Sequence, residues 1–182
     1  MKFIKNRKVA AGITCIIVLM SILIGGHSSL TRLRIEVLNQ FYYGDEYTGK
    51  GIQGDLKYMV GQCYNLTVVA QRYIDKDDEK IKEVIKYRDL FQGALTPEEE
   101  VGTSTKAIEA AMKLYETMGT IELEQRDQYY RDSFAVNIES RRLIISHSGY
   151  NEKGLLFNQN LDRFPANVLS KITVIKPLVL YE

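Results

Sequence analysis

The first feature along the chain is a long apolar run without a charged side chain, from Val9 to Gly26. A helix that crosses the hydrocarbon core of a bilayer needs about 20 such residues, and it satisfies its own backbone groups. A cleaved signal peptide shares the basic start and the apolar core, but no Ala-x-Ala site follows here. The pattern therefore predicts an uncleaved, single-pass transmembrane anchor over residues 9–26, after a basic flank at residues 1–8.

Beyond the anchor, selected positions recur with spacings typical of a helix face. The clearest series alternates four and three: Ile52, Leu56, Met59, Cys63, Leu66, Ala70 and Tyr73. Further series are Ile81, Val84, Ile85, Arg88 and Phe91; Ala107, Ala111, Leu114, Met118 and Ile121; Tyr130, Phe134, Ile138, Leu143 and Ile145; and Tyr150, Gly154, Phe157, Leu161 and Phe164. This coiled-coil-like spacing predicts helices packed along nearly parallel or antiparallel neighbours.

Local signals mark where some of these helices begin. The acid-rich segment 75–78, with Asp75, Asp77 and Asp78, favours a helix start, because negative charge is stabilised at a helix N-terminus. In Thr96-Pro97-Glu98-Glu99, Thr96 can cap a helix, Pro97 suits its first position and Glu99 can close a capping box. We therefore expect one helix to start at residues 75–78 and another at Pro97.

Two prolines limit the C-terminal part of the chain. Pro165 interrupts the last helical series, and Pro177 excludes a helix interior, so residues 172–182 are predicted to form an extended tail. The remaining elements predict an all-α fold. It consists of an antiparallel helical bundle of about four long helices over residues 27–171, preceded by the transmembrane helix.

The charges are distributed unevenly along the chain. The N-terminal flank carries four basic residues and no acid: Lys2, Lys5, Arg7 and Lys8. Without them, 20 Lys and Arg remain against 23 Asp and Glu, a balance that argues against nucleic-acid binding. Only Arg32 and Arg34 follow the anchor closely, so the positive-inside rule favours a cytoplasmic N-terminus and an extracytoplasmic domain.

Sequence motifs for catalysis or cofactor binding are weak. Residues 49–54 read G-x-G-x-x-G, but a dinucleotide site needs a strand before that loop, and a regular helical series follows instead. Residues 75–79 lack the glycine and the final glutamate of a calcium loop. His27 and His147 belong to no H-E-x-x-H motif. We therefore expect no enzyme, and no catalytic, cofactor-binding or metal-binding residue.

One loop carries a cluster of aromatic residues. Tyr42, Tyr43 and Tyr47 lie close to Gly44 and to the glycines that follow. Exposed aromatic side chains are enriched in protein–protein interfaces. These three tyrosines are a candidate partner-binding loop, although packing of the loop on itself explains them equally well.

Several strings of residues resemble the LemA family. They are Ser29–Arg34; Leu56-Lys57, Asn65-Leu66, Tyr73 and Arg88; Tyr150-Asn151, Phe157-Asn158, Phe164–Asn167, Lys176-Pro177 and Tyr181-Glu182. The resemblance spans most of the chain. It implies an antiparallel helical bundle on one membrane helix in a bacterial cell envelope, and it implies no reaction. Relative to that family, residues 42–49 look like an insertion that either bulges the first long helix or folds it back.

Together these observations predict a membrane-anchored helical scaffold or protein-interaction module of the bacterial cell envelope. The expected partners are the membrane, through the N-terminal helix, and another envelope protein or a second copy of the chain. The alternative is a ligand-binding or hydrolytic domain with a site between the helices, which helical bundles can build from inward-facing polar side chains.

Overall fold

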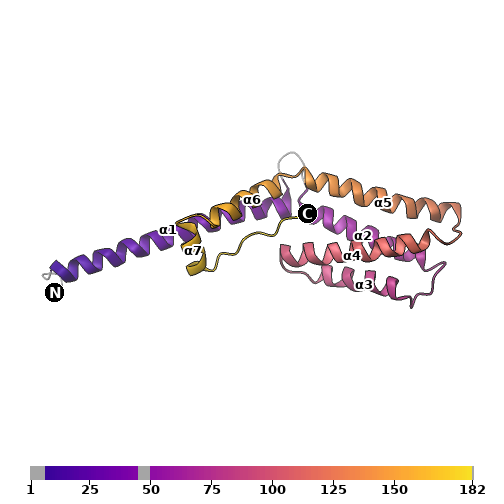
Figure 1. Ribbon diagram of the computed structural model, residues 1–182, viewed down its shortest axis with the longest axis horizontal. Coiled ribbons are helices and arrows are strands. Elements are labelled where there is room, and N and C mark those ends of the chain that lie inside the picture. The colour runs from indigo at the N-terminus through magenta and orange to yellow at the C-terminus, as the bar shows by residue number, and fades with distance from the viewer. Residues whose placement is uncertain (1–6, 45–49, 182) are drawn as a thin grey trace. The chain divides into compact units, whose positions relative to one another are not determined.

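The computed structural model describes residues 7–44 and 50–181. Within these ranges the chain forms seven α-helices and no β-strand (Figure 1). The four longest are Arg7–Tyr43 (α1), Ile52–Ala70 (α2), Pro97–Met118 (α4) and Gln125–Ser146 (α5). The three shorter ones are Glu79–Gln92 (α3), Gly149–Leu161 (α6) and Ala166–Thr173 (α7). The predicted all-α, bundle-like fold with one long apolar N-terminal helix is confirmed.

The chain divides into two compact units. We call the first the anchor unit, which comprises Met1–Val37 and Lys153–Leu178, and the second the bundle unit, which comprises Leu38–Glu152 and Val179–Glu182. Helices α1 and α6 each contribute residues to both units. The sequence suggested one bundle over residues 27–171, whereas these contacts group most of α6 and all of α7 with the first part of α1.

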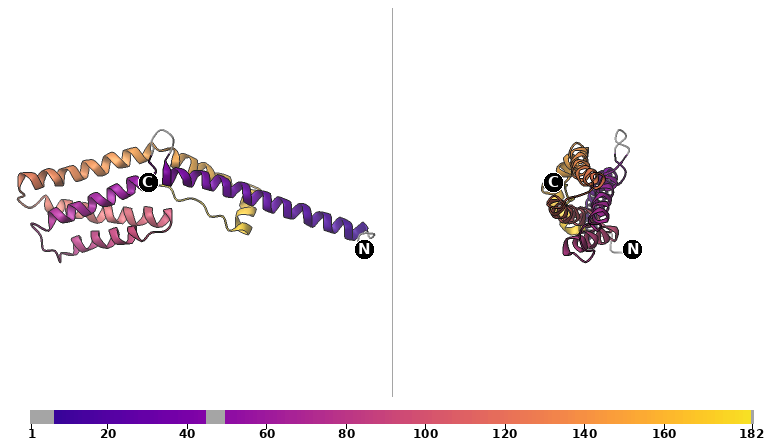
Figure 2. Two further views of the ribbon diagram at one scale, coloured as in Figure 1. Left: turned by 180° about the vertical axis from the view of Figure 1, so that it is seen from behind. Right: turned by 90° about the vertical axis from the view of Figure 1, so that its right-hand side faces the viewer.

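Helix α2 is central to the bundle unit. It packs against α3, α4 and α5, and α2, α3 and α4 lie side by side in both views (Figures 1 and 2). Six of its predicted interface positions are at most 3% exposed: Ile52, Leu56, Met59, Cys63, Leu66 and Ala70. Tyr73 follows the end of the helix and is half-buried. The alternating spacing thus identified the buried face of α2, because side chains three and four apart share one face of a helix.

The predicted helix starts are confirmed with one shift. The carboxylate of Asp78 accepts from Lys80 N (2.8 Å) and caps α3, and Thr96 Oγ1 accepts from Glu99 N (3.2 Å) and caps α4. The Glu99 carboxylate reaches back to Leu95 N (2.8 Å) rather than to the backbone N–H of Thr96. The expected capping box is therefore displaced by one residue, and it still satisfies an N–H beside the helix end.

Most predicted interface positions of α3 and α4 are buried. They are Ile81, Val84 and Phe91 on α3, and Ala107, Ala111, Leu114 and Met118 on α4. Ile85 and Arg88 are half-buried, and Ile121 lies beyond the end of α4. The alanines let α4 approach its neighbours closely, since a small side chain adds little between two helix backbones.

Two of the apolar or aromatic residues that the sequence singles out on α5 are exposed. The buried residues of this helix are Asp127, Phe134, Ile138 and Ile145. Tyr130 is 54% exposed and Leu143 is 59% exposed. Leu143 lies nine residues after Phe134, which at 3.6 residues per turn places it on the opposite face. Tyr130 is exposed because α5 packs mainly on α2, and α4 reaches only a small part of it.

In the anchor unit, α1 is one continuous helix that contains the predicted anchor. Its most apolar 18-residue window has a mean hydropathy of 2.4, and none of that window is buried within the protein. It is the one described helix long and apolar enough to cross a membrane. Ile16, Leu19 and Ile24 are among the apolar side chains that this helix leaves exposed.

The last helical series ends earlier than the spacing predicts. Helix α6 stops at Leu161, and Phe164, which was expected on its buried face, is 84% exposed. A separate short helix, α7, follows Pro165 and ends at Val174, which has a positive φ of 58°. A left-handed conformation is uncommon for a β-branched residue. From Val174 to Tyr181 the chain is irregular, whereas the first two residues of the predicted tail, Ile172 and Thr173, belong to α7.

Several residues that carry the family resemblance hold this tail. In the anchor unit, Asn158 donates to Leu178 O (2.8 Å) and accepts from Leu178 N (2.7 Å). In the bundle unit, Asn151 makes the same pair of hydrogen bonds with the backbone of Tyr181, and Tyr150 Oη donates to Val179 O (2.7 Å). The two asparagine side chains satisfy backbone groups that an isolated extended segment leaves without protein partners.

Candidate functional site: an open groove between α2 and α5

Two ion pairs hold α5 on α2, and the acidic and basic partners are exchanged between the two helices from one pair to the other. At one end Arg141 Nη1 of α5 lies 3.1 Å from Asp55 Oδ1 of α2. At the other end Arg72 Nη1, just after α2, lies 2.7 Å from Asp127 Oδ1 of α5. Because the acid is on α2 at one end and on α5 at the other, a parallel arrangement would bring like charges together. The ion pairs therefore specify the antiparallel direction and the register of this helix pair.

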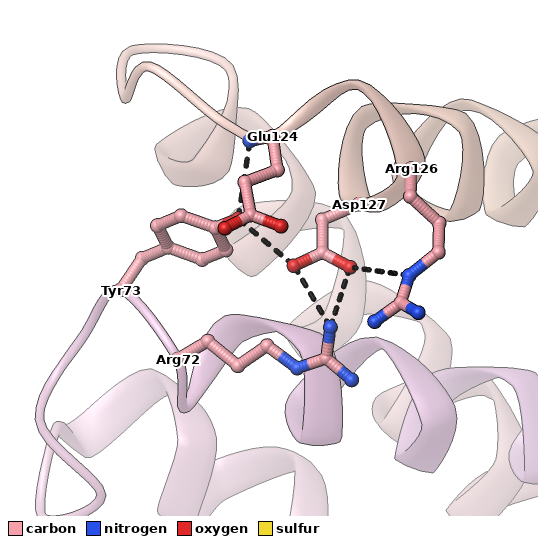
Figure 3. A network of polar contacts seen from close by, with 5 residues as sticks. All are labelled: Arg72, Tyr73, Glu124, Arg126 and Asp127. Atoms are coloured by element: carbon pink, nitrogen blue, oxygen red, sulfur yellow. Dashed lines mark hydrogen bonds and ion pairs between the residues drawn. The ribbon is translucent and has the colours of Figure 1, made fainter.

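A denser polar network surrounds Asp127 (Figure 3). Its two carboxylate oxygens accept from Arg72 Nη1 at 2.7 and 3.0 Å, and one of them also accepts from Tyr73 Oη at 2.8 Å. Arg126 Nε lies 3.8 Å away. The Tyr73 hydroxyl in turn accepts from Glu124 N at 3.1 Å, at the start of α5. The network thus joins the segment after α2 to the first turn of α5.

The network keeps Asp127 ionised although its side chain is only 1% exposed. Desolvation alone would raise the pKa of this carboxyl group. The hydrogen bonds from Tyr73 and Arg72, together with the charges of Arg72 and Arg126, outweigh desolvation and hold the pKa below its ordinary value. Its place in the first turn of α5 also favours a negative charge. Asp127 therefore serves to hold the two helices together.

Tyr73 keeps its proton in the same network. The hydrogen bond from Glu124 N lowers the pKa of the phenol, but desolvation and the neighbouring Asp127 carboxylate raise it by more, so that the pKa lies above its ordinary value. The protonated hydroxyl can then donate to Asp127 and accept from the backbone at once. This arrangement is suited to a structural link.

Beside this network an open groove of about 970 Å³ runs between α2 and α5. Its floor is apolar and comes from Leu66, Val69 and Phe134, which are at most 8% exposed. The other lining residues are Gln62, Asn65, Val68, Arg72, Arg126, Tyr129, Tyr130, Asp132, Ser133, Val136 and Asn137. An apolar floor with polar and aromatic edges is typical of grooves that bind an amphipathic helix.

Four exposed apolar or aromatic side chains gather on the groove. Val68 is 45% exposed, Tyr129 70%, Tyr130 54% and Val136 68%. Single exposed apolar residues are ordinary on protein surfaces, but a cluster beside a concave surface is a candidate interaction site. The sequence did not identify this site. Its available signal was the Tyr129-Tyr130 pair within an otherwise polar stretch.

Two of the tyrosines proposed from the sequence, Tyr42 and Tyr43, do not line this groove. Tyr42 and Tyr43 end α1, where Tyr43 is 74% exposed and the Tyr42 ring packs against Phe41 with centroids 5.2 Å apart. Tyr47 lies outside the described residues, as does most of the proposed insertion. The first two residues of that insertion extend α1. Gly44 follows with a φ of +80°, a conformation that suits glycine.

Gly51, within the glycine-rich motif, has a packing role. A side chain on Gly51 would collide with the backbone of Phe41 and Tyr42, so only glycine allows the start of α2 to approach the end of α1 this closely. Gly51 is also the N-cap residue of α2. These contacts explain one glycine of the motif without any ligand.

The remaining reactive side chains do not converge. Burial raises the pKa of the Cys63 thiol to about 12, so the nucleophilic thiolate is scarce at neutral pH. His147 caps α5, and its Nδ1 lies 2.8 Å from Leu143 O. Among residues 7–44 and 50–181, no group of three His, Cys, Asp or Glu side chains is arranged to hold a metal ion.

Comparison of the chain with protein-family models, with curated proteins and with solved structures finds no match. The geometry of the groove and the composition of α1 are therefore the observations from which we infer a function for this chain.

Proposed function

We propose that this chain is a membrane-anchored helical interaction module that binds another protein of a bacterial cell envelope through the groove between α2 and α5. The groove, with its apolar floor and clustered exposed side chains, is the observation that carries the proposal. The apolar part of α1 would hold the bundle unit at the membrane. The resemblance of the residues around the tail to the LemA family supports the same envelope setting.

The occupant that the groove fits best is an amphipathic helix of the partner. The lining runs from Gln62 to Val69 on α2, about two turns or roughly 12 Å of helix, and continues to Arg72 just after the helix. At the Arg72 end, Asp127 neutralises Arg72, and Asp132 pairs with Arg131 at 3.0 Å. Arg126, with a 68% exposed side chain, then adds a net positive charge. Positive charge complements the C-terminal carbonyls of a docked helix.

Photo-crosslinking from the groove tests this proposal. A photoreactive amino acid in place of Val136 is expected to capture, in intact cells, one amphipathic helical segment of an envelope protein, identified by mass spectrometry. Val68→Asp should abolish the adduct, because it introduces a charge where the apolar face of that helix would pack. Leu90→Asp is the matched control, since Leu90 is 49% exposed on α3, away from the groove.

Persistence of the same adduct in Val68→Asp would refute docking in this groove. Capture of nothing from Val136, alongside capture from a photoreactive residue in place of Tyr43, would instead move the partner site to the end of α1, as the sequence suggested.

We also propose that the N-terminus is cytoplasmic and the bundle unit extracytoplasmic, because four basic residues precede the anchor and two closely follow it. Leu95 is 87% exposed and suits a reporter cysteine. We expect Leu95→Cys to react with a membrane-impermeant maleimide in intact cells. The wild-type chain should stay unlabelled, because Cys63 is buried and Cys15 lies in the apolar run that we place inside the bilayer. Labelling of Leu95→Cys only after cell lysis would reverse the assigned orientation.

A further inference from the structure

The segment around α7 presents an apolar surface that the described residues of the anchor unit leave uncovered. Three of its side chains are spaced four residues apart: Phe164 is 84% exposed, Val168 48% and Ile172 59%. Val174, at the end of the helix, is 75% exposed. We call these four residues the α7 face. A second side of the helix is also apolar but is buried, because Leu169 is only 8% exposed.

Leu169 places α7 at a defined level along α1. A methyl group added to Gly26 would lie 2.6 Å from Leu169 Cδ1, so the leucine side chain sits directly against the backbone of α1 at this glycine. Gly26 is the last residue of the apolar run that begins at Val9, and the polar residues His27, Ser28 and Ser29 follow it. That run is about 27 Å long at 1.5 Å per residue, close to the thickness of the hydrocarbon core. If α1 spans a bilayer, Gly26 lies at the boundary between hydrocarbon and headgroups.

The direction and charge of the segment also match this boundary. Figure 1 shows α7 running across the direction of α1 rather than along it, which is the direction of the bilayer plane when α1 crosses the bilayer. Arg163 and Lys171 are exposed beside the apolar side chains. Lys176 follows in the tail, where its carbonyl accepts from Arg34 Nε of α1 at 3.4 Å. Basic residues flanking an apolar surface are typical of helices that lie on anionic membranes.

We propose that α7 is an interfacial helix of the same membrane that α1 spans. The α7 face enters the boundary between headgroups and acyl chains, and Arg163 and Lys171 contact anionic phospholipid headgroups. The Gly26–Leu169 contact holds α7 beside the end of the apolar run of α1 and leaves the α7 face exposed there, which is why lipid, rather than a second protein, is its occupant. This inference rests on the proposed membrane anchor. It adds a second membrane contact, which would fix the depth at which α1 leaves the bilayer.

Tryptophan fluorescence can test the inference, because the chain contains no tryptophan. The full-length variant Phe164→Trp would be reconstituted into vesicles of phosphatidylcholine and phosphatidylglycerol. Some vesicles would carry bromine near the headgroup end of the acyl chains and others near the methyl end. We expect blue-shifted emission and a larger loss of intensity from the shallow bromines than from the deep ones. Phe164 is largely exposed, so the substitution should not disturb folding.

Two further variants make the outcome decisive. Leu19→Trp, in the middle of the apolar run, should be quenched more by the deep bromines, and Leu95→Trp, in the bundle unit, should be quenched by neither. Quenching of Leu19→Trp without quenching of Phe164→Trp would overturn the interfacial helix and leave the anchor intact. If neither Leu19→Trp nor Phe164→Trp were quenched, both the interfacial helix and the membrane anchor would be overturned. A blue-shifted but unquenched Phe164→Trp would show that protein, such as a second copy, covers this face instead of lipid.

Discussion

Replacement of Arg72 by methionine is expected to lower the free energy of unfolding of the bundle unit by about 3 kcal/mol at pH 7, because it leaves a buried carboxylate without its main cation. Asp127 would keep only the hydrogen bond from Tyr73 and the distant charge of Arg126. Urea unfolding of the protein in detergent micelles, followed by circular dichroism, measures the change. Arg126→Met is the matched control, with an expected loss below about 1 kcal/mol, because its guanidinium is exposed and 3.8 Å from the carboxylate.

Arg72→Met should also invert the pH dependence that Asp127 contributes to the free energy of unfolding. In the wild type the pKa of Asp127 is below its ordinary value, so its contribution to stability is present above about pH 4 and is lost as the pH falls through the folded-state pKa. Without Arg72, desolvation is expected to raise that pKa above the unfolded-state value. The loss of free energy of unfolding caused by Arg72→Met should therefore shrink as the pH is lowered from 7 to 5. Asp127→Asn in the Arg72→Met background should recover part of that loss. A penalty independent of pH would contradict the described network.

Substitution of Leu66 by aspartate should abolish the cooperative unfolding transition of the bundle unit. Leu66 is 3% exposed on the face of α2 that packs in the bundle, and a carboxylate there would be buried without a partner. Val68 lies two residues further along the same helix and is 45% exposed, so Val68→Asp should change the free energy of unfolding by less than about 1 kcal/mol.

This pair of variants also separates folding from binding. Val68→Asp should keep the bundle unit folded while removing the apolar edge of the groove. Equal denaturation profiles for the Leu66 and Val68 variants would show that the register of α2 differs from the one described.

The face of α2 could be predicted from spacing alone, because every buried position that the pattern selected there is apolar or a thiol. The buried face of α5 could not. There, charged Asp127 is buried and Leu143 is exposed, the reverse of what hydrophobic periodicity assumes. The burial of Asp127 depends on Arg72, 55 residues away in sequence, and such a pair is not visible in local spacing.

The candidate groove depends on the extent of tertiary packing rather than on a motif. It is open because α5 packs mainly on α2 and only slightly on α4, which leaves Tyr129, Tyr130 and Val136 exposed. Nothing in the local sequence distinguishes a tyrosine that is covered by a neighbouring helix from one that is not. The short helix α7 escaped prediction for a related reason: two turns after Pro165 are too few to establish a helical period.

The most direct test of the proposed membrane-anchored module is the fate of the full-length protein during alkaline extraction of cell membranes. We expect the wild type to stay in the membrane pellet. Ile16→Lys together with Leu19→Lys should release it to the supernatant, because each lysine in the middle of a transmembrane helix costs about 3 kcal/mol on insertion scales. Release of the wild-type protein to the same extent as the double-lysine variant would contradict anchoring by α1, and with it the account of this protein as a membrane-held interaction module.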